Sequence, residues 1–87
     1  MVIIEYEPKF KKSIKHIKDP VLKERIKKQI RKSIENPEIG DFLSYDKKNE
    51  RKIYIPPFRL LYSYNKEKDL ITIIDFDNRD KIYKKKF

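Results

Sequence analysis

The spacing of hydrophobic residues changes twice in the first half of the chain. A short β-branched run over residues 2–6, stopped by Pro8, predicts a first strand. Phe10, Ile14 and Ile17 then recur at helical spacing, with lysines between them, so a helix is expected from about Lys9.

Asp19 and Pro20 interrupt this pattern and begin a new one. Aspartate is a favoured N-cap and proline is favoured in the first helical turn, so the pair predicts the start of a second helix. That helix is expected to end near Asn36 and Pro37. Its apolar residues follow one another at intervals of four: Leu22, Ile26, Ile30 and Ile34. The two helices should form a hairpin with one apolar side.

Two alternating runs meet at Pro56 and Pro57 in the stretch RKIYIPPFRLLYSY, residues 51–64. If the prolines form the turn, counting outward pairs Ile55 with Phe58 and Tyr54 with Arg59. Alternation then gives the sheet two different faces. The apolar face, expected to receive the helices, holds Ile53, Ile55, Phe58, Leu60 and Tyr62. The mixed face holds Lys52, Tyr54, Arg59, Leu61 and Ser63.

A third strand over residues 70–76 is apolar at almost every position, which is typical of a central strand. With Leu61, its Ile74 and Phe76 are expected to floor a shallow groove, and the rim of that groove is expected to be Lys52, Tyr54 and Arg59. Residues 38–49 are expected to form a loop that Phe42 and Leu43 attach to the core.

These elements predict an α+β fold of one domain, residues 1–87. A small, mostly antiparallel sheet of about four strands would pack on the helical hairpin, in the order β-α-α-β-β-β. A chain of 87 residues can form a two-layer core but not a deep enclosed pocket, so its chemistry is expected on an open surface.

The net charge is +9, and residues 1–36 carry 11 Lys/Arg against 5 Asp/Glu. Such a field favours polyanions, either nucleic acid or an acidic protein, although a lysine-rich surface can also serve solubility alone. The chain has no cysteine, which excludes disulfides and thiolate chemistry. No apolar run reaches the length of a membrane span and the start does not resemble a signal peptide, so a cytoplasmic location is expected.

Few residues offer acid–base or metal chemistry. His16 is the only histidine and lies off the apolar stripe of the first helix, as a surface residue would. Asp75, Asp77 and Asp80 are more typical of turns and salt bridges than of a magnesium site, so neither a metal nor another cofactor is expected.

The motif FRLLYSY, followed by an apolar strand and RDKIY, resembles the RelE/ParE toxin superfamily, and most closely its RelE branch. The match in element order covers essentially the whole chain. The resemblance implies a small sheet flanked by helices, similar to microbial ribonucleases. It also implies the toxin of a toxin–antitoxin pair, an endoribonuclease that cuts mRNA in the ribosomal A site.

The resemblance also implies an active site. Lys52 and Arg59 match basic residues around the turn, Arg79 matches an arginine near the C-terminus and Tyr83 matches the aromatic residue that closes the site. Two features depart from the RelE pattern: Tyr54 stands where a second lysine is expected, and Asp75, Asp77 and Asn78 stand where further basic residues are expected.

RNA cleavage without a metal requires the 2′-OH to attack the adjacent phosphate. Arg59 and Arg79 are expected to bind the phosphate oxygens. Either Tyr83 or Lys52 would act as base, and Arg79 or a second cation would assist the leaving group. Tyr54 is expected to stack on a base. Further RNA contacts are expected from basic residues outside the groove: Lys23, Lys27, Arg31 and Lys84.

Three functional classes follow from these patterns. The first is the ribosome-dependent endoribonuclease, with the ribosome and mRNA as partners. The second is a ParE-like toxin that binds DNA gyrase and cuts nothing. The third is a non-catalytic module that binds nucleic acid or an acidic protein. For either toxin, a RelB-like antitoxin, acidic and wrapping, is expected to form a heteromeric complex with the chain.

Overall fold

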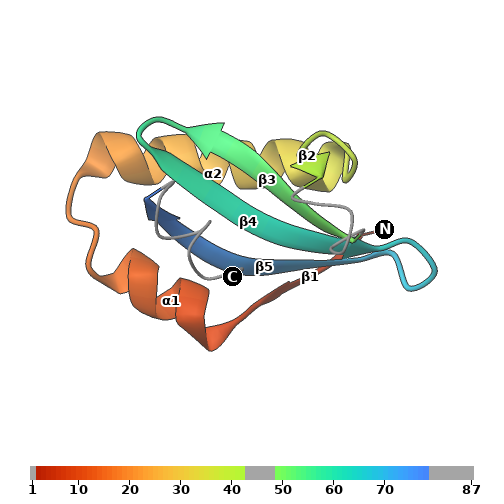
Figure 1. Cartoon of the computed structure of the whole chain (residues 1–87). Helices are drawn as coiled ribbons and strands as arrows, with labels where there is room; N and C mark the ends of the chain where they lie inside the picture. Colours follow the sequence, from red (N-terminus) through yellow and green to blue (C-terminus); the bar gives the residue numbers. More distant parts are fainter. Residues whose placement is uncertain (1, 43–48, 79–87) are drawn as a thin grey trace.

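The computed structural model describes residues 2–42 and 49–78. Its sheet has five strands in the order β1-β5-β4-β3-β2 (Figure 1). Strand β1 is parallel to β5, and all the other pairs are antiparallel. The elements along the chain are β1 (Ile3–Tyr6), α1 (Pro8–Lys15), α2 (Pro20–Glu35), β2 (Asp41–Phe42), β3 (Glu50–Ile55), β4 (Phe58–Asn65) and β5 (Leu70–Asn78). The predicted α+β class and element order are confirmed, with β2 as an added strand.

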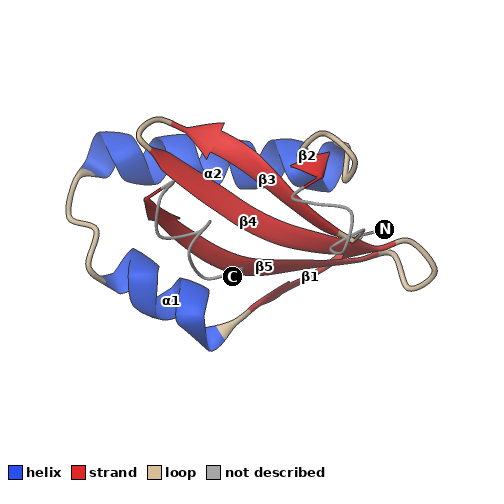
Figure 2. Ribbon diagram, in the orientation of Figure 1, coloured by secondary structure: helices blue, strands red, loops and turns tan. Residues whose placement is uncertain are grey.

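Both helices begin where the sequence indicates. Pro8 and Pro20 occupy the first turns, and the Asp19 carboxylate accepts a hydrogen bond of 2.9 Å from the Val21 amide. Helix α1 packs against β5 and α2 packs against β3 (Figure 2). Each helix therefore covers its own part of the sheet, although both contribute to one core.

That core lies between the helices and the apolar face of the sheet. Phe10 of α1 and Ile26 of α2 meet strand residues that are almost fully buried: Ile55, Leu60, Tyr62, Ile71, Ile73 and Phe76. Ile53 and Phe58 pack against the same cluster, so the predicted apolar face is confirmed.

The apolar stripe of α2 ends before its last predicted residue. Ile34 is exposed and Ser33 is fully buried, with its hydroxyl donating to the Ile30 carbonyl at 2.6 Å. A spacing of four residues advances an α-helix by about 40° beyond a full turn. By Ile34 the stripe has rotated away from the sheet, and Ser33 has taken its place.

The pairing of β3 with β4 follows the predicted register. Ile55 pairs with Phe58, Tyr54 with Arg59, Ile53 with Leu60 and Lys52 with Leu61. Pro56 and Pro57 form the turn, and the peptide bond between them is cis. The separation into an apolar face and a mixed face therefore holds for these two strands.

The expectation that Phe76 floors the groove is wrong. Phe76 pairs with Leu60, belongs to the helix-side core and contacts the Phe58 ring at 5.0 Å between centroids. The cause is a β-bulge: Leu61 pairs with Asp75 but Tyr62 pairs with Ile73, which leaves Ile74 without a partner in β4. One extra residue reverses the alternation along the rest of β5.

The described start of the expected 38–49 loop, residues 38–42, is not a simple loop. Asp41 pairs with Lys52 and Phe42 with Arg51, which makes β2 an edge strand beside β3. The side chain of Phe42 and the whole of Leu43 lie outside the described residues. The expected attachment of the loop by these two side chains therefore stays a prediction.

Two side chains of the neighbouring strands fix the backbone ahead of β2. The buried Tyr62 hydroxyl donates to the Pro37 carbonyl at 2.8 Å and accepts from the Gly40 amide at 3.0 Å. Arg51 donates to the Glu38 carbonyl at 3.1 Å and to the Gly40 carbonyl at 2.7 Å. Burial raises the pKa of the Tyr62 phenol, which keeps it protonated as this donor.

Gly40 is required at this point. A Cβ atom on it would lie 2.8 Å from the Lys52 carbonyl oxygen and 2.9 Å from the Tyr62 ring and hydroxyl. The single glycine of the sequence therefore marks a close approach of two strands, not a phosphate-binding loop. Among the described residues, no helix is long and apolar enough to cross a membrane.

Candidate active site

Lys52, Tyr54 and Arg59 lie on the mixed face, opposite the helix-side core. Lys52 pairs with Leu61 and Tyr54 with Arg59, so alternation places all four side chains on one side of β3 and β4. Tyr54 is 56% exposed, and Lys52 and Arg59 are half-buried. Leu61 is only 4% exposed but is not part of the helix-side cluster. The structure thus brings together the three rim residues that the sequence predicted, around an apolar centre.

The Arg59 guanidinium lies over the Tyr54 ring. Its central carbon is 3.8 Å from the ring centroid, well within the range of a cation–π contact. The predicted register made these residues cross-strand neighbours, but it gave no sign that their side chains stack. This contact restricts where the positive charge of Arg59 can lie.

Carboxylates stand beside both cations of the mixed face. Asp41 of β2 pairs with Lys52, and Asp77 of β5 pairs with Arg59. Directly opposed residues have Cβ atoms about 4.5–5.5 Å apart, close enough for their charges to interact. Among the described residues of this face, each of the two cations thus has a carboxylate as a cross-strand neighbour.

Asp75, which pairs with Leu61, contacts helix α1. It is 1% exposed, and its carboxylate accepts hydrogen bonds from the Phe76 amide at 2.9 Å and the Ser13 hydroxyl at 3.4 Å. Lys9 approaches the same carboxylate at 3.8 Å. The two α1 side chains and Asp75 thus fasten α1 to β5. Within the described ranges, no group of three or more His, Asp or Glu side chains could hold a metal ion.

The predicted RNA contacts of α2 lie on the other layer of the molecule. Lys23, Lys27 and Arg31 are exposed, and Lys27 forms a surface ion pair of 3.7 Å with Glu24. Helix α2 covers the helix-side core, whereas Lys52 and Arg59 belong to the other face of the sheet. The predicted contact of the α2 residues with RNA stays a prediction.

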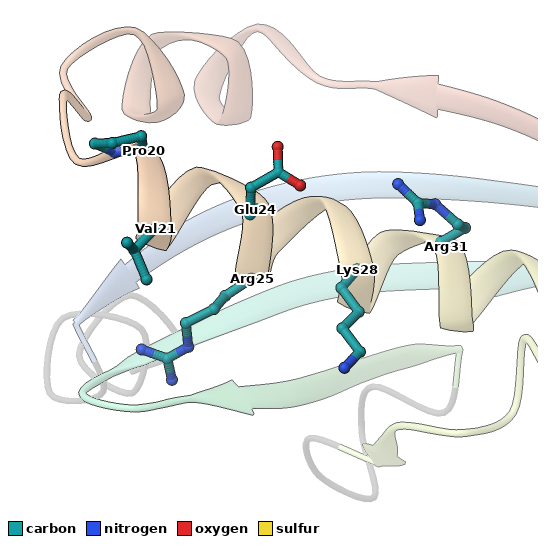
Figure 3. Close-up of a pocket in the computed structure, with 6 residues that line it drawn as sticks. All are labelled: Pro20, Val21, Glu24, Arg25, Lys28 and Arg31. Carbon is teal, nitrogen blue, oxygen red and sulfur yellow. The ribbon is translucent and has the colours of Figure 1, made fainter.

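An open groove of about 550 Å³ runs along the outside of α2 (Figure 3). Its lining is apolar near the helix start and basic further along: Pro20, Val21, Glu24, Arg25, Lys28 and Arg31. Arg25 extends toward the β3–β4 turn, where it donates to the Pro56 carbonyl at 3.3 Å. The lining holds one carboxylate, Glu24, among three basic side chains, so the groove offers a mostly positive surface for contact.

The remaining predicted site residues lie outside the described part of the chain. Arg79, Tyr83 and Lys84 all follow residue 78, as does Asp80. His16 is described and exposed, at the C-cap of α1. The described part of the candidate site therefore consists of Lys52, Tyr54 and Arg59, with Asp41 and Asp77 as cross-strand neighbours.

Comparison with known proteins identifies the family. The family model of the ParE toxin of the type II toxin–antitoxin system parDE matches residues 4–83. The chain belongs to this family. It is therefore a toxin of a type II toxin–antitoxin system, within the RelE/ParE superfamily. No curated protein sequence matches the chain significantly.

Solved structures of RelE toxins share the fold. The isolated Escherichia coli RelE toxin superimposes with a TM-score of 0.77 at 18% identity, covering 99% of this chain and 95% of that one. A chain of the E. coli RelBE toxin–antitoxin complex gives 0.77 at 19%, covering 90% and 96%. A chain of the RelB–RelE complex of Methanococcus jannaschii gives 0.69 at 21%, covering 93% and 96%. At these identities the likeness establishes a RelE-like fold.

Proposed function

We propose that this toxin is an endoribonuclease that cleaves mRNA in the ribosomal A site. The observation that carries the proposal is the placement of Lys52, Tyr54 and Arg59 on one exposed face of paired strands, in a toxin with a RelE-like fold. Lys52 and Arg59 provide cations for a phosphate, and the Tyr54 ring lies against the Arg59 guanidinium.

The reaction is a transfer of the phosphate within the RNA. The 2′-oxygen bonds to phosphorus as the bond from phosphorus to the 5′-oxygen breaks, giving a cyclic phosphate and a free 5′-OH. The 2′-OH proton passes to a base, and the 5′-oxygen gains a proton. Arg59 supports the charge that develops on the phosphate oxygens. Lys52 or Tyr83 would take the 2′-OH proton, and Arg79 would assist the leaving oxygen.

The charge balance of the mixed face supports dependence on the ribosome. Asp41 and Asp77 offset Lys52 and Arg59, so free RNA gains little electrostatic attraction to this surface. A substrate already held in the A site does not need that attraction, because the ribosome supplies both orientation and local concentration. Such a toxin acts in the cytoplasm.

An antitoxin would have to mask this activity. The RelE toxins of E. coli and M. jannaschii were crystallised in complexes with RelB antitoxins. We propose a RelB-like partner here that is acidic, contains a helix and wraps the toxin in a heteromeric complex. The basic groove along α2, with its apolar start at Pro20 and Val21, suits an acidic amphipathic segment.

The second candidate function is inhibition of DNA gyrase without RNA cleavage. The family assignment favours it, because the matching model is that of ParE toxins. The carboxylates beside Lys52 and Arg59 agree with a surface that does not bind phosphate. The third class, a non-catalytic binding module, has no comparable support.

The deciding experiment exposes one defined mRNA to the purified toxin, both free and on programmed ribosomes. We expect cleavage only on the ribosome, and a loss of about a hundredfold in the Arg59→Ala variant, the usual effect of removing a donor to a transition-state oxyanion. Lys11→Ala is the charge-matched control, because Lys11 is exposed on α1. Intact mRNA together with inhibited DNA supercoiling would reject the nuclease in favour of gyrase inhibition.

A further inference from the structure

The Tyr54–Arg59 contact leaves the hydrogen-bonding groups of the arginine available. A guanidinium carries five N–H donors in its own plane, whereas the contact with the ring uses its flat face. Among the described residues, Arg59 has one further contact, a marginal hydrogen bond of 3.5 Å to the Phe58 carbonyl. The ring therefore restrains the cation without consuming the donors that a phosphate needs.

Asp77 is the second cross-strand neighbour of Arg59. In the row across the sheet, Arg59 stands between Tyr54 of β3 and Asp77 of β5. A bidentate pair between an arginine and a carboxylate uses the in-plane N–H donors of the guanidinium, whereas a contact with an aromatic face does not. The guanidinium carbon lies 3.8 Å from the Tyr54 centroid, over the ring of the neighbour in β3.

We propose that Tyr54 is a positioning residue. Its ring holds the Arg59 guanidinium so that the N–H edge stays open to a phosphate group. In terms of function this inference rests on the proposed nuclease, for which Arg59 is the phosphate ligand. The proposal also explains why an aromatic residue can stand where RelE-type sequences are expected to carry a second lysine. Tyr54 adds no positive charge, but it holds the positive charge of Arg59 in place.

Three variants at residue 54 separate stacking from mere bulk. Tyr54→Phe keeps an aromatic face, Tyr54→Leu keeps an apolar side chain without one, and Tyr54→Lys restores the lysine of the RelE pattern. Tyr54 is 56% exposed, so all three should fold like the wild type, which far-ultraviolet circular dichroism and thermal unfolding would verify.

The first measurement is independent of any RNA. The Arg59 Nε–Hε signal in ¹⁵N–¹H NMR spectra should carry the ring-current shift of Tyr54, retained in Tyr54→Phe and lost in Tyr54→Leu. In a titration with inorganic phosphate, Tyr54→Leu should bind about two- to fivefold more weakly than Tyr54→Phe, as expected for a cation–π contact near the surface. Equal Arg59 signals and equal phosphate affinities in these two variants would overturn the proposal.

The second measurement is cleavage of ribosome-bound mRNA. We expect kcat/KM to fall in Tyr54→Leu by the same two- to fivefold and to be retained in Tyr54→Phe. If the NMR and phosphate results hold but the wild type cuts no mRNA, the positioning role stands and the nuclease is rejected. If the wild type cuts mRNA and Tyr54→Leu matches Tyr54→Phe in every readout, the nuclease stands and the positioning role is rejected. Recovery of phosphate binding in Tyr54→Lys without the ring-current shift would show that a second charge can replace the stacked ring.

Discussion

Replacing Tyr62 with phenylalanine removes one buried hydroxyl and keeps the ring in the core. Two hydrogen bonds are lost, to the Pro37 carbonyl and from the Gly40 amide. Each is worth about 0.5–1.5 kcal/mol net, and a buried amide left without a partner costs about 1–3 kcal/mol. We expect the free energy of unfolding to fall by about 2–4 kcal/mol, out of a total near 4–13 kcal/mol for a chain of this length.

Urea unfolding followed by circular dichroism would measure this loss, with the slope against urea unchanged if the unfolded state is unaffected. In thermal unfolding the midpoint should fall by at least about 8 °C. Tyr64→Phe is the matched control, because it also removes a tyrosine hydroxyl from β4. The Tyr64 hydroxyl donates to the Asp69 carboxylate in the β4–β5 turn, whereas the Tyr62 hydroxyl bonds to the 37–40 segment. If Tyr64→Phe destabilises the protein as much as Tyr62→Phe does, the 37–40 segment does not depend on the Tyr62 hydroxyl.

Two further predictions concern the same region. Gly40→Ala should destabilise the fold by about 1–3 kcal/mol, because the new Cβ meets the Lys52 carbonyl at 2.8 Å and the Tyr62 ring at 2.9 Å; a urea midpoint equal to wild type would contradict this. Alkaline pH should also destabilise the protein. Since burial raises the pKa of Tyr62 above the value near 10 of an unfolded chain, its contribution is complete below about pH 10 and is lost as the pH rises through the native pKa. Urea midpoints compared on either side of pH 10 should show a smaller decline in Tyr62→Phe than in wild type.

The sequence alone predicts the β3–β4 hairpin that carries the candidate site. Two prolines mark the turn, and strict alternation on both sides leaves one register that buries an apolar face. For this reason the alternation alone assigns Lys52, Tyr54 and Arg59 to one face, and the strand pairing agrees. Asp19 and Pro20 likewise identified the start of α2, because both act through local backbone geometry.

Other features of the fold and the site depend on contacts between side chains and strands, and a local sequence pattern does not predict them. The bulge at Ile74 moves Phe76 to the other face of the sheet. The apolar residues of β5 fit either face, so their pattern does not reveal the bulge. Strand β2 has two residues, too few for any periodicity, and exists because Tyr62 and Arg51 hold the backbone before it. The stacking of Arg59 on Tyr54 is a choice of side-chain conformation between neighbours, which register alone does not determine.

The parallel pairing of β1 with β5 sets the order in which the fold can form during synthesis. Ile3 lies beside Leu70 and Tyr6 beside Ile73, so the first strand has no partner until residues 70–78 have left the ribosome. Those residues also bring Ile71, Ile73 and Phe76 to the core and Asp75 to α1. In a nascent chain that ends before β5, α2 can already pack on β3, but β1 has no partner and α1 has no strand to cover. The complete sheet therefore assembles only after nearly all of the described chain has been made.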